Sequence, residues 1–163
     1  MKRLALVILV ILFVFVSCSQ PTYGILKYQE RDIVAQCLVN DNFRCILEKK
    51  QGILTLKILE PQALSSVSFV FEGDGALAIS GEVKIPLSKE SLDGIYALLM
   101  VLCLREEELT SAKEEENGEA TLCFLNGQGE YTLKIGKNQM PKSAEIISDG
   151  YHYKVIFESI MIE

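Results

Sequence analysis

Residues 33–59 read IVAQCLVNDNFRCILEKKQGILTLKIL, and this stretch indicates the architecture of the chain. Apolar residues occupy every second position in three runs, at 33–39, 43–47 and 54–58. The runs are separated by Asn40-Asp41-Asn42 and by Lys50-Gln51-Gly52, which are residue types that favour tight turns. Alternation with a period of two, interrupted by short turns, is typical of antiparallel strands that bury one face. We therefore predict a meander of hairpins.

The same pattern continues beyond this stretch. Pro61 ends the third run, and alternating runs follow at 67–71, 77–79 and 83–85, with glycine-rich turns at 73–75 and 81. Later runs occur at 122–124, 131–135, 144–146 and 151–157. The acidic residues between 106 and 116 interrupt the pattern, and we interpret 106–118 as a solvated loop rather than as a cation site. The sequence predicts five or six strands, then a helix, then four more strands.

The predicted helix follows Pro86. Ser88 is a suitable N-cap, and Leu92, Ile95, Leu99 and Leu102 fall at helical spacing. The middle of this segment is apolar on every face, which indicates a helix that is covered on all sides. The predicted fold class is therefore α+β, an open antiparallel β half-barrel plugged by one buried helix.

The N-terminal region has the features of an export signal. Lys2 and Arg3 precede thirteen unbroken apolar residues, Leu4 to Val16. This length suits a secretory signal, of about 7–15 apolar residues, better than a membrane span, which needs about 18 or more. Phe15-Val16-Ser17-Cys18 resembles the bacterial lipoprotein box, and that resemblance implies lipidation of Cys18. The alternative is an uncleaved signal anchor.

This interpretation divides the chain into three parts. Residues 1–17 are the lipoprotein signal peptide, 18–31 a lipid-anchored linker, and 32–163 the half-barrel domain. The protein is then expected at the cell membrane, on the extracytoplasmic face, held through the lipid on Cys18.

Charge argues against one class of partner. The chain has a formal net charge of −6, and removal of Lys2 and Arg3 with the signal peptide makes it −8. An acidic domain is not suited to bind nucleic acid or to adhere to anionic lipid through a basic face. Contact with the membrane is therefore expected to depend on the anchor.

Four further cysteines, Cys37, Cys45, Cys103 and Cys123, match no metal-binding spacing. A three-residue loop at 40–42 would place Cys37 opposite Cys45, so this pair could form a disulfide in an exported protein. A pairing of Cys103 with Cys123 is also open. The alternative is that all four are small apolar fillers of the core.

Residues for catalysis are not apparent. The one histidine, His152, alternates with Tyr151 and Tyr153, so it faces away from the apolar side of its strand. No nucleophile motif, zinc motif or phosphate-binding glycine loop is present. We expect no enzyme activity, no cofactor and no metal.

The order of elements resembles the Lol-type lipoprotein carrier superfamily, especially the small envelope lipoproteins of Gram-positive bacteria. The similarity lies in Gly52 to Pro61, in Leu64-Ser65-Ser66-Val67-Ser68-Phe69, and in the turn at 73–75. It implies an incomplete antiparallel barrel with an apolar interior. Carriers of that family shield acyl chains and are not anchored, whereas the lipidation cysteine makes this chain more similar to an anchored protein.

Two functions remain open. The domain could bind an apolar ligand, such as an acyl chain or a lipopeptide, between sheet and helix, at a site formed by Phe69, Phe71, Leu99 and Leu102. It could instead be a self-filled structural lipoprotein that binds another envelope protein. Retention of an extractable lipid would distinguish the two.

Overall fold

The computed structural model describes residues 31–163; the predicted signal peptide, Cys18 and the linker up to residue 30 lie outside the described residues. Six strands come first: β1 (Ile33–Val39), β2 (Phe43–Lys50), β3 (Ile53–Glu60), β4 (Val67–Glu72), β5 (Gly75–Ser80) and β6 (Val83–Leu87). Helix α2 (Asp93–Met100) follows. The last five strands are β7 (Leu109–Glu114), β8 (Ala120–Asn126), β9 (Gly129–Ile135), β10 (Pro141–Ser148) and β11 (Tyr151–Ile162). Single 3-10 turns occupy Gln62–Leu64, Glu90–Leu92 and Glu106–Glu108.

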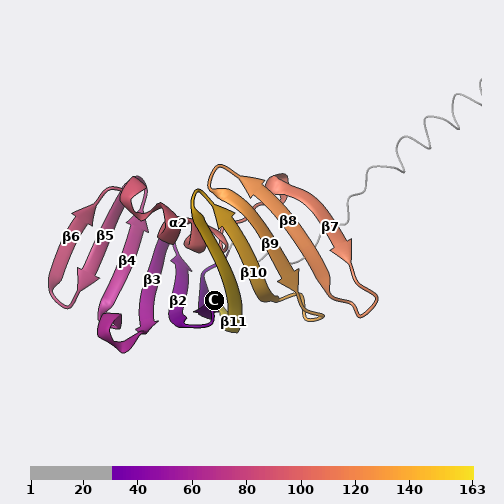
Figure 1. The fold of residues 1–163 in the computed structure, drawn as a ribbon, viewed down its shortest axis with the longest axis horizontal. Helices are drawn as coiled ribbons and strands as arrows, with labels where there is room; N and C mark the ends of the chain where they lie inside the picture. Colours follow the sequence, from indigo (N-terminus) through magenta and orange to yellow (C-terminus); the bar gives the residue numbers. More distant parts are fainter. Residues whose placement is uncertain (1–30) are drawn as a thin grey trace, which may run out of the picture.

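All eleven strands form one antiparallel sheet in the order β6-β5-β4-β3-β2-β1-β11-β10-β9-β8-β7. The chain runs outward from β1 to the edge strand β6, crosses through α2 to the other edge at β7, and returns to β11. Figure 1 shows the resulting open, curved sheet. Helix α2 lies between its N-terminal wing, strands β1–β6, and its C-terminal wing, strands β7–β11. The predicted open antiparallel sheet is thus confirmed, and residues 31–163 contain one short α-helix of eight residues.

The first hairpins form as the sequence predicts. Val39 pairs with Phe43, Cys37 with Cys45, and Ala35 with Leu47. Asn40 and Asp41 take positive φ angles of 48° and 62° in the turn, a conformation that Asn and Asp tolerate better than most residues. Between β2 and β3, Gln51 and Gly52 both have positive φ, as a two-residue type I′ turn requires.

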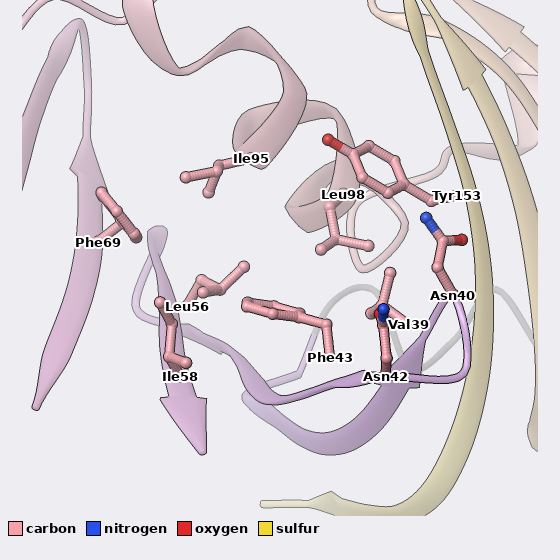
Figure 2. A pocket seen from close by; sticks show the side chains of 10 residues that line it. All are labelled: Val39, Asn40, Asn42, Phe43, Leu56, Ile58, Phe69, Ile95, Leu98 and Tyr153. Atoms are coloured by element: carbon pink, nitrogen blue, oxygen red, sulfur yellow. The ribbon is translucent and has the colours of Figure 1, made fainter. Parts of the chain in front are cut away.

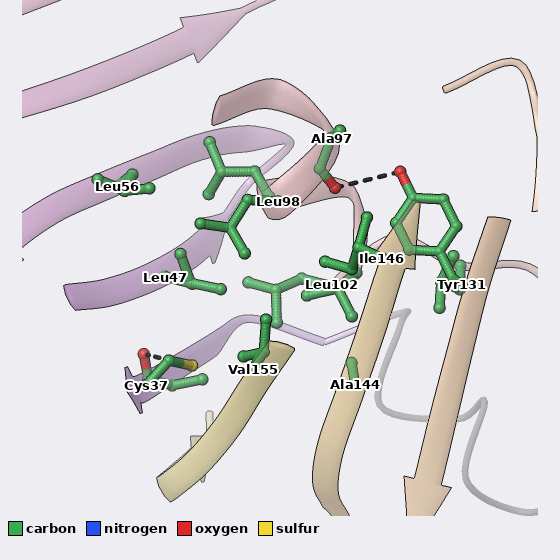
Figure 3. Close-up of a cluster of buried hydrophobic side chains, with 14 of the residues drawn as sticks. Cys37, Leu47, Leu56, Ala97, Leu98, Leu102, Tyr131, Ala144, Ile146 and Val155 are labelled. Carbon is green, nitrogen blue, oxygen red and sulfur yellow. Dashed lines mark hydrogen bonds between the residues drawn. The ribbon is translucent and has the colours of Figure 1, made fainter. Parts of the chain in front are cut away.

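The core lies between the concave face of the sheet and the helix (Figure 3). Helix α2 contacts β3 on one wing and β10 on the other. Its residues Ala97, Leu98 and Leu99 are buried, as are Val101, Leu102 and Leu104 directly after it. Residues 31–163 contain no helix whose length and hydropathy would allow it to span a bilayer.

Three sequence predictions are corrected by the structure. Residues 109–114 form strand β7, not a solvated loop, and the helix ends at Met100 instead of continuing to Leu104. Ser88 does not cap α2: its hydroxyl accepts a hydrogen bond from the Ser91 backbone N–H at 3.3 Å, within the preceding 3-10 turn. An edge strand whose side chains are exposed on both faces has no apolar alternation to reveal it, and β7 is exposed along almost its whole length.

Candidate ligand-binding cavity

A cavity of about 340 Å³ lies between α2 and the concave face of the sheet. Figure 2 shows Phe43, Leu56 and Leu98 pointing into the space, with Phe69 on one side and Tyr153 on the other. The remaining lining residues are Val39, Asn40, Asn42, Ile58 and Ile95. Its volume is at the lower end of the range of about 300–1,000 Å³ that is usual for small-molecule sites.

The register of the strands explains why these side chains of the sheet line the cavity. Val39 and Phe43 pair across β1 and β2, and Leu56 pairs with Phe69 across β3 and β4. Directly paired residues of antiparallel strands point to the same face. The side chains therefore converge on the concave side, below the helix.

Helix α2 is held above the cavity by close contacts. Gly94 packs so tightly against β11 that a Cβ atom there would lie 2.6 Å from the Tyr153 hydroxyl oxygen. Toward the other end of the helix, the buried Tyr131 hydroxyl donates a hydrogen bond to the Ala97 carbonyl oxygen at 3.1 Å. The centroids of the Tyr96 and Phe71 rings are 5.4 Å apart. The roof of the cavity is thus fixed by contacts with both wings.

The polar groups of the lining are few and uncharged. The Asn40 side chain already has two hydrogen-bond partners within the protein. It donates to the His152 carbonyl oxygen at 3.3 Å and accepts from the Lys154 backbone N–H at 2.8 Å. Within residues 31–163, the Asn42 amide and the Tyr153 hydroxyl have no hydrogen-bond partner. Burial, and secondarily the neighbouring Tyr151, raises the pKa of Tyr153, so its hydroxyl stays a neutral donor.

Of the four residues predicted to bind a ligand, only Phe69 lines the cavity. Phe71, Leu99 and Leu102 are buried in the core, with exposed fractions of 2%, 0% and 3%. The structure therefore places these three in the hydrophobic core and not in the lining of the cavity. Sequence reasoning missed Phe43, Ile95, Leu98 and Tyr153, although Phe43 and Tyr153 belonged to the alternating runs and Ile95 and Leu98 to the helix.

The four cysteines of the domain are free thiols in the structure. Cys37 and Cys45 are opposed, as expected, and fully buried. Burial raises the pKa of Cys45 to about 12 and raises that of Cys37 further. Cys123 lies on the convex face, with its sulfur 4.0 Å from the Thr132 hydroxyl, whereas Cys103 packs against the core. The fold thus keeps Cys103 and Cys123 on opposite sides of the sheet.

The other candidate groups do not form a reactive centre within residues 31–163. His152 is exposed, and its Nε2 lies 2.6 Å from a carboxylate oxygen of Glu145 on the neighbouring strand. No three His, Cys, Asp or Glu side chains of this region gather as metal ligands. A second cavity, of about 310 Å³, has a mixed lining that includes Lys142 and Glu158 beside Phe157.

Comparison with known proteins adds information on the fold alone. No family model and no curated protein matches the sequence. The solved structure of an uncharacterized conserved protein from Thermus thermophilus superposes with a TM-score of 0.50, at 14% identity and over 88% of each chain. The chain is also similar to a LolA superfamily protein from Nitrosomonas europaea, at 11% identity over 86% of this chain and 92% of that one. The TM-score for that pair is 0.42.

Proposed function

We propose that this protein is a non-enzymatic, membrane-anchored lipoprotein whose domain binds one apolar chain in the cavity below α2. The observation that carries the proposal is the lining of that cavity, where seven of the ten residues are aliphatic or phenylalanine and none is charged. An apolar cavity of this size is costly when it is empty, because its lining side chains lack contact partners. An acyl chain would supply those contacts.

The anchoring part of the proposal rests on the sequence. The thirteen apolar residues before Cys18, and the lipoprotein-like box, favour export and lipidation. The similarity of residues 52–69 to the Lol-type carriers favours the same interior chemistry. The domain would then lie at the extracytoplasmic face of the membrane, close to a source of acyl chains.

The proposal can be tested by filling the cavity. Purified full chain should carry an extractable lipid in mass spectrometry. Saturating ligand, at about one hundred times its dissociation constant, should stabilise the protein by about 2.7 kcal/mol in thermal unfolding. Ile95→Trp places a large ring in the cavity and should abolish this stabilisation.

Ile147→Trp is the matched control, because Ile147 is exposed on the convex face. It should bind and be stabilised as the wild type is. If the wild type neither retains lipid nor responds to any acyl compound, the binding function is refuted. The alternative is then favoured, a self-filled domain that binds another envelope protein, since Leu99 and Leu102 already fill much of the interior.

A further inference from the structure

The cavity continues into an exposed apolar track that runs across the N-terminal wing. Leu56 pairs with Phe69, Phe69 with Ala78, and Ala78 with Ile85, so all four point to the concave face. Burial decreases along this row, from 1% exposure at Leu56 to 52% at Ile85. Val83, which is 59% exposed, lies beside Ile85 on the same face of the edge strand.

The opposite end of the cavity is polar. Asn42 belongs to the exposed turn between β1 and β2, and Tyr153 lies on β11 across the central strand. Both line the cavity and both have unused hydrogen-bonding capacity among the described residues. Asp41, next to Asn42, adds a negative charge at this end, and no Lys or Arg lines the cavity.

These features impose a direction on a bound amphiphile. A polar head group is accommodated at the β1–β2 turn, and the tail leads past Phe69 toward Ala78 and Ile85. The path from β1 to β6 crosses five strand spacings, or about 24 Å along the sheet. The cavity volume of about 340 Å³ leaves room for one chain rather than for several.

The head group is expected to be uncharged. A carboxylate placed between Asn42 and the half-buried Tyr153 would lose part of its hydration, and no Lys or Arg lines the cavity to pair with it. It would also lie near the negative charge of Asp41 on an acidic protein. An ester or amide instead offers a carbonyl oxygen, which the Asn42 amide or the Tyr153 hydroxyl can donate to.

We propose that the site is selective for a single-chain amphiphile with an uncharged, hydrogen-bonding head group, bound across the strands with its head at Asn42 and Tyr153 and its tail on Ala78 and Ile85. This inference rests on the proposed function, because it assigns an orientation and a chemical class to the same ligand.

The tail is tested with two monoacylglycerols, decanoyl and palmitoyl, whose binding to the purified full chain is measured below their aggregation concentrations. Ile85→Ser should weaken the binding of monopalmitoyl glycerol by about five- to tenfold, since about half of the side chain is available for new contact. It should leave monodecanoyl glycerol unchanged, because the shorter tail ends inside the cavity. Ile147→Ser, at 51% exposure on the convex face, is the control and should change neither.

The head group is tested with palmitate and monopalmitoyl glycerol above neutral pH. The neutral glyceride should bind at least about tenfold more tightly. Asn42→Leu and Tyr153→Phe should each weaken glyceride binding by about fivefold, the value expected for one lost hydrogen bond. Tyr151→Phe is the control, because Tyr151 stacks on Tyr153 but does not line the cavity.

The results separate the two proposals. If neither compound binds, the proposed function itself fails. If palmitate and the glyceride bind equally well, or Ile85→Ser has the same effect on both tail lengths, the cavity binds apolar chains but the orientation and head-group selectivity are refuted.

Discussion

Tyr131→Phe tests whether α2 is secured by its hydrogen bond to β9. The last carbonyl groups of a helix have no partner within the helix. In α2, the Leu99 and Met100 carbonyls accept from the N–H groups of Leu102 and Cys103, and the Ala97 carbonyl accepts from the Tyr131 hydroxyl at 3.1 Å. Tyr131 is 1% exposed and Ala97 is fully buried, so water cannot replace the lost donor.

The expected cost follows from this burial. A buried carbonyl that loses its partner costs about 1–3 kcal/mol. For a domain of this size, that corresponds to a decrease in Tm of about 3–5 °C per kcal/mol. Urea unfolding should show a lower midpoint with an unchanged m value, because the surface exposed on unfolding stays the same.

The control is Tyr151→Phe, since Tyr151 is 45% exposed and forms no hydrogen bond within residues 31–163. Its stability should stay within about 0.5 kcal/mol of the wild type. A Tyr131→Phe protein that is as stable as this control would refute the reasoning, and α2 would then be held by apolar packing alone.

Three further predictions concern the thiols, the helix contact and the anchor. Because burial raises the pKa of Cys45 from 9.0 to about 12, the unfolded state loses this proton first, and the free energy of unfolding should fall above about pH 9, by about 1.4 kcal/mol per pH unit for each buried thiol. Cys45→Ala should reduce this slope, and a slope that the substitution leaves unchanged would contradict a free, buried Cys45 thiol. Gly94→Ala should lower Tm, because the clash with Tyr153 costs about 1–3 kcal/mol against a helix-propensity gain of about 1 kcal/mol, and a higher Tm would contradict the tight contact. Cys18→Ala should abolish labelling by a palmitate analogue in a bacterial host while Cys103→Ala labels normally; equal labelling of both would exclude Cys18 as the lipid site.

The central strands could be predicted from the sequence because one face of each is buried. In β1 every second residue is buried from Ile33 to Val39, and a turn of three residues then determines the pairing with β2. The faces of β5 were harder to predict. Leu77 and Ile79 alternate in the sequence, yet their partners Val70 and Ser68 point away from the helix, and the small Ala76 and Ala78 face the core instead.

The lining of the cavity was only partly predictable, because it depends on which distant strands pair. Phe69 was found because it stands in an obvious apolar run. Tyr153 lines the same cavity as Phe43 only because β11 pairs with β1 in the middle of the sheet, and this pairing joins residues more than one hundred positions apart. Local patterns carry no information about which distant strands become neighbours. The end of the helix was predicted wrongly for a related reason. Val101, Leu102 and Leu104 are buried by tertiary packing, although they lie beyond the last helical residue, Met100.

The position of the first and last strands has a consequence for folding. Every strand pairing in the sheet is a local hairpin except that of β1 with β11, where Ile33 lies opposite Ile162 and the Glu163 N–H donates to the Asp32 carbonyl at 3.0 Å. Each wing can therefore form from short-range contacts. The pairing of β1 with β11 instead brings together the two ends of the domain, and such long-range pairing is the slow step in chains of high contact order. A circular permutant that joins residues 163 and 32 through a short linker and opens between the exposed residues 105 and 106, in the crossover from α2 to β7, would turn the β1–β11 pairing into a hairpin and leave every other hairpin intact. It would keep the same sheet and fold faster, with the two wings nucleating from the centre instead of meeting there last.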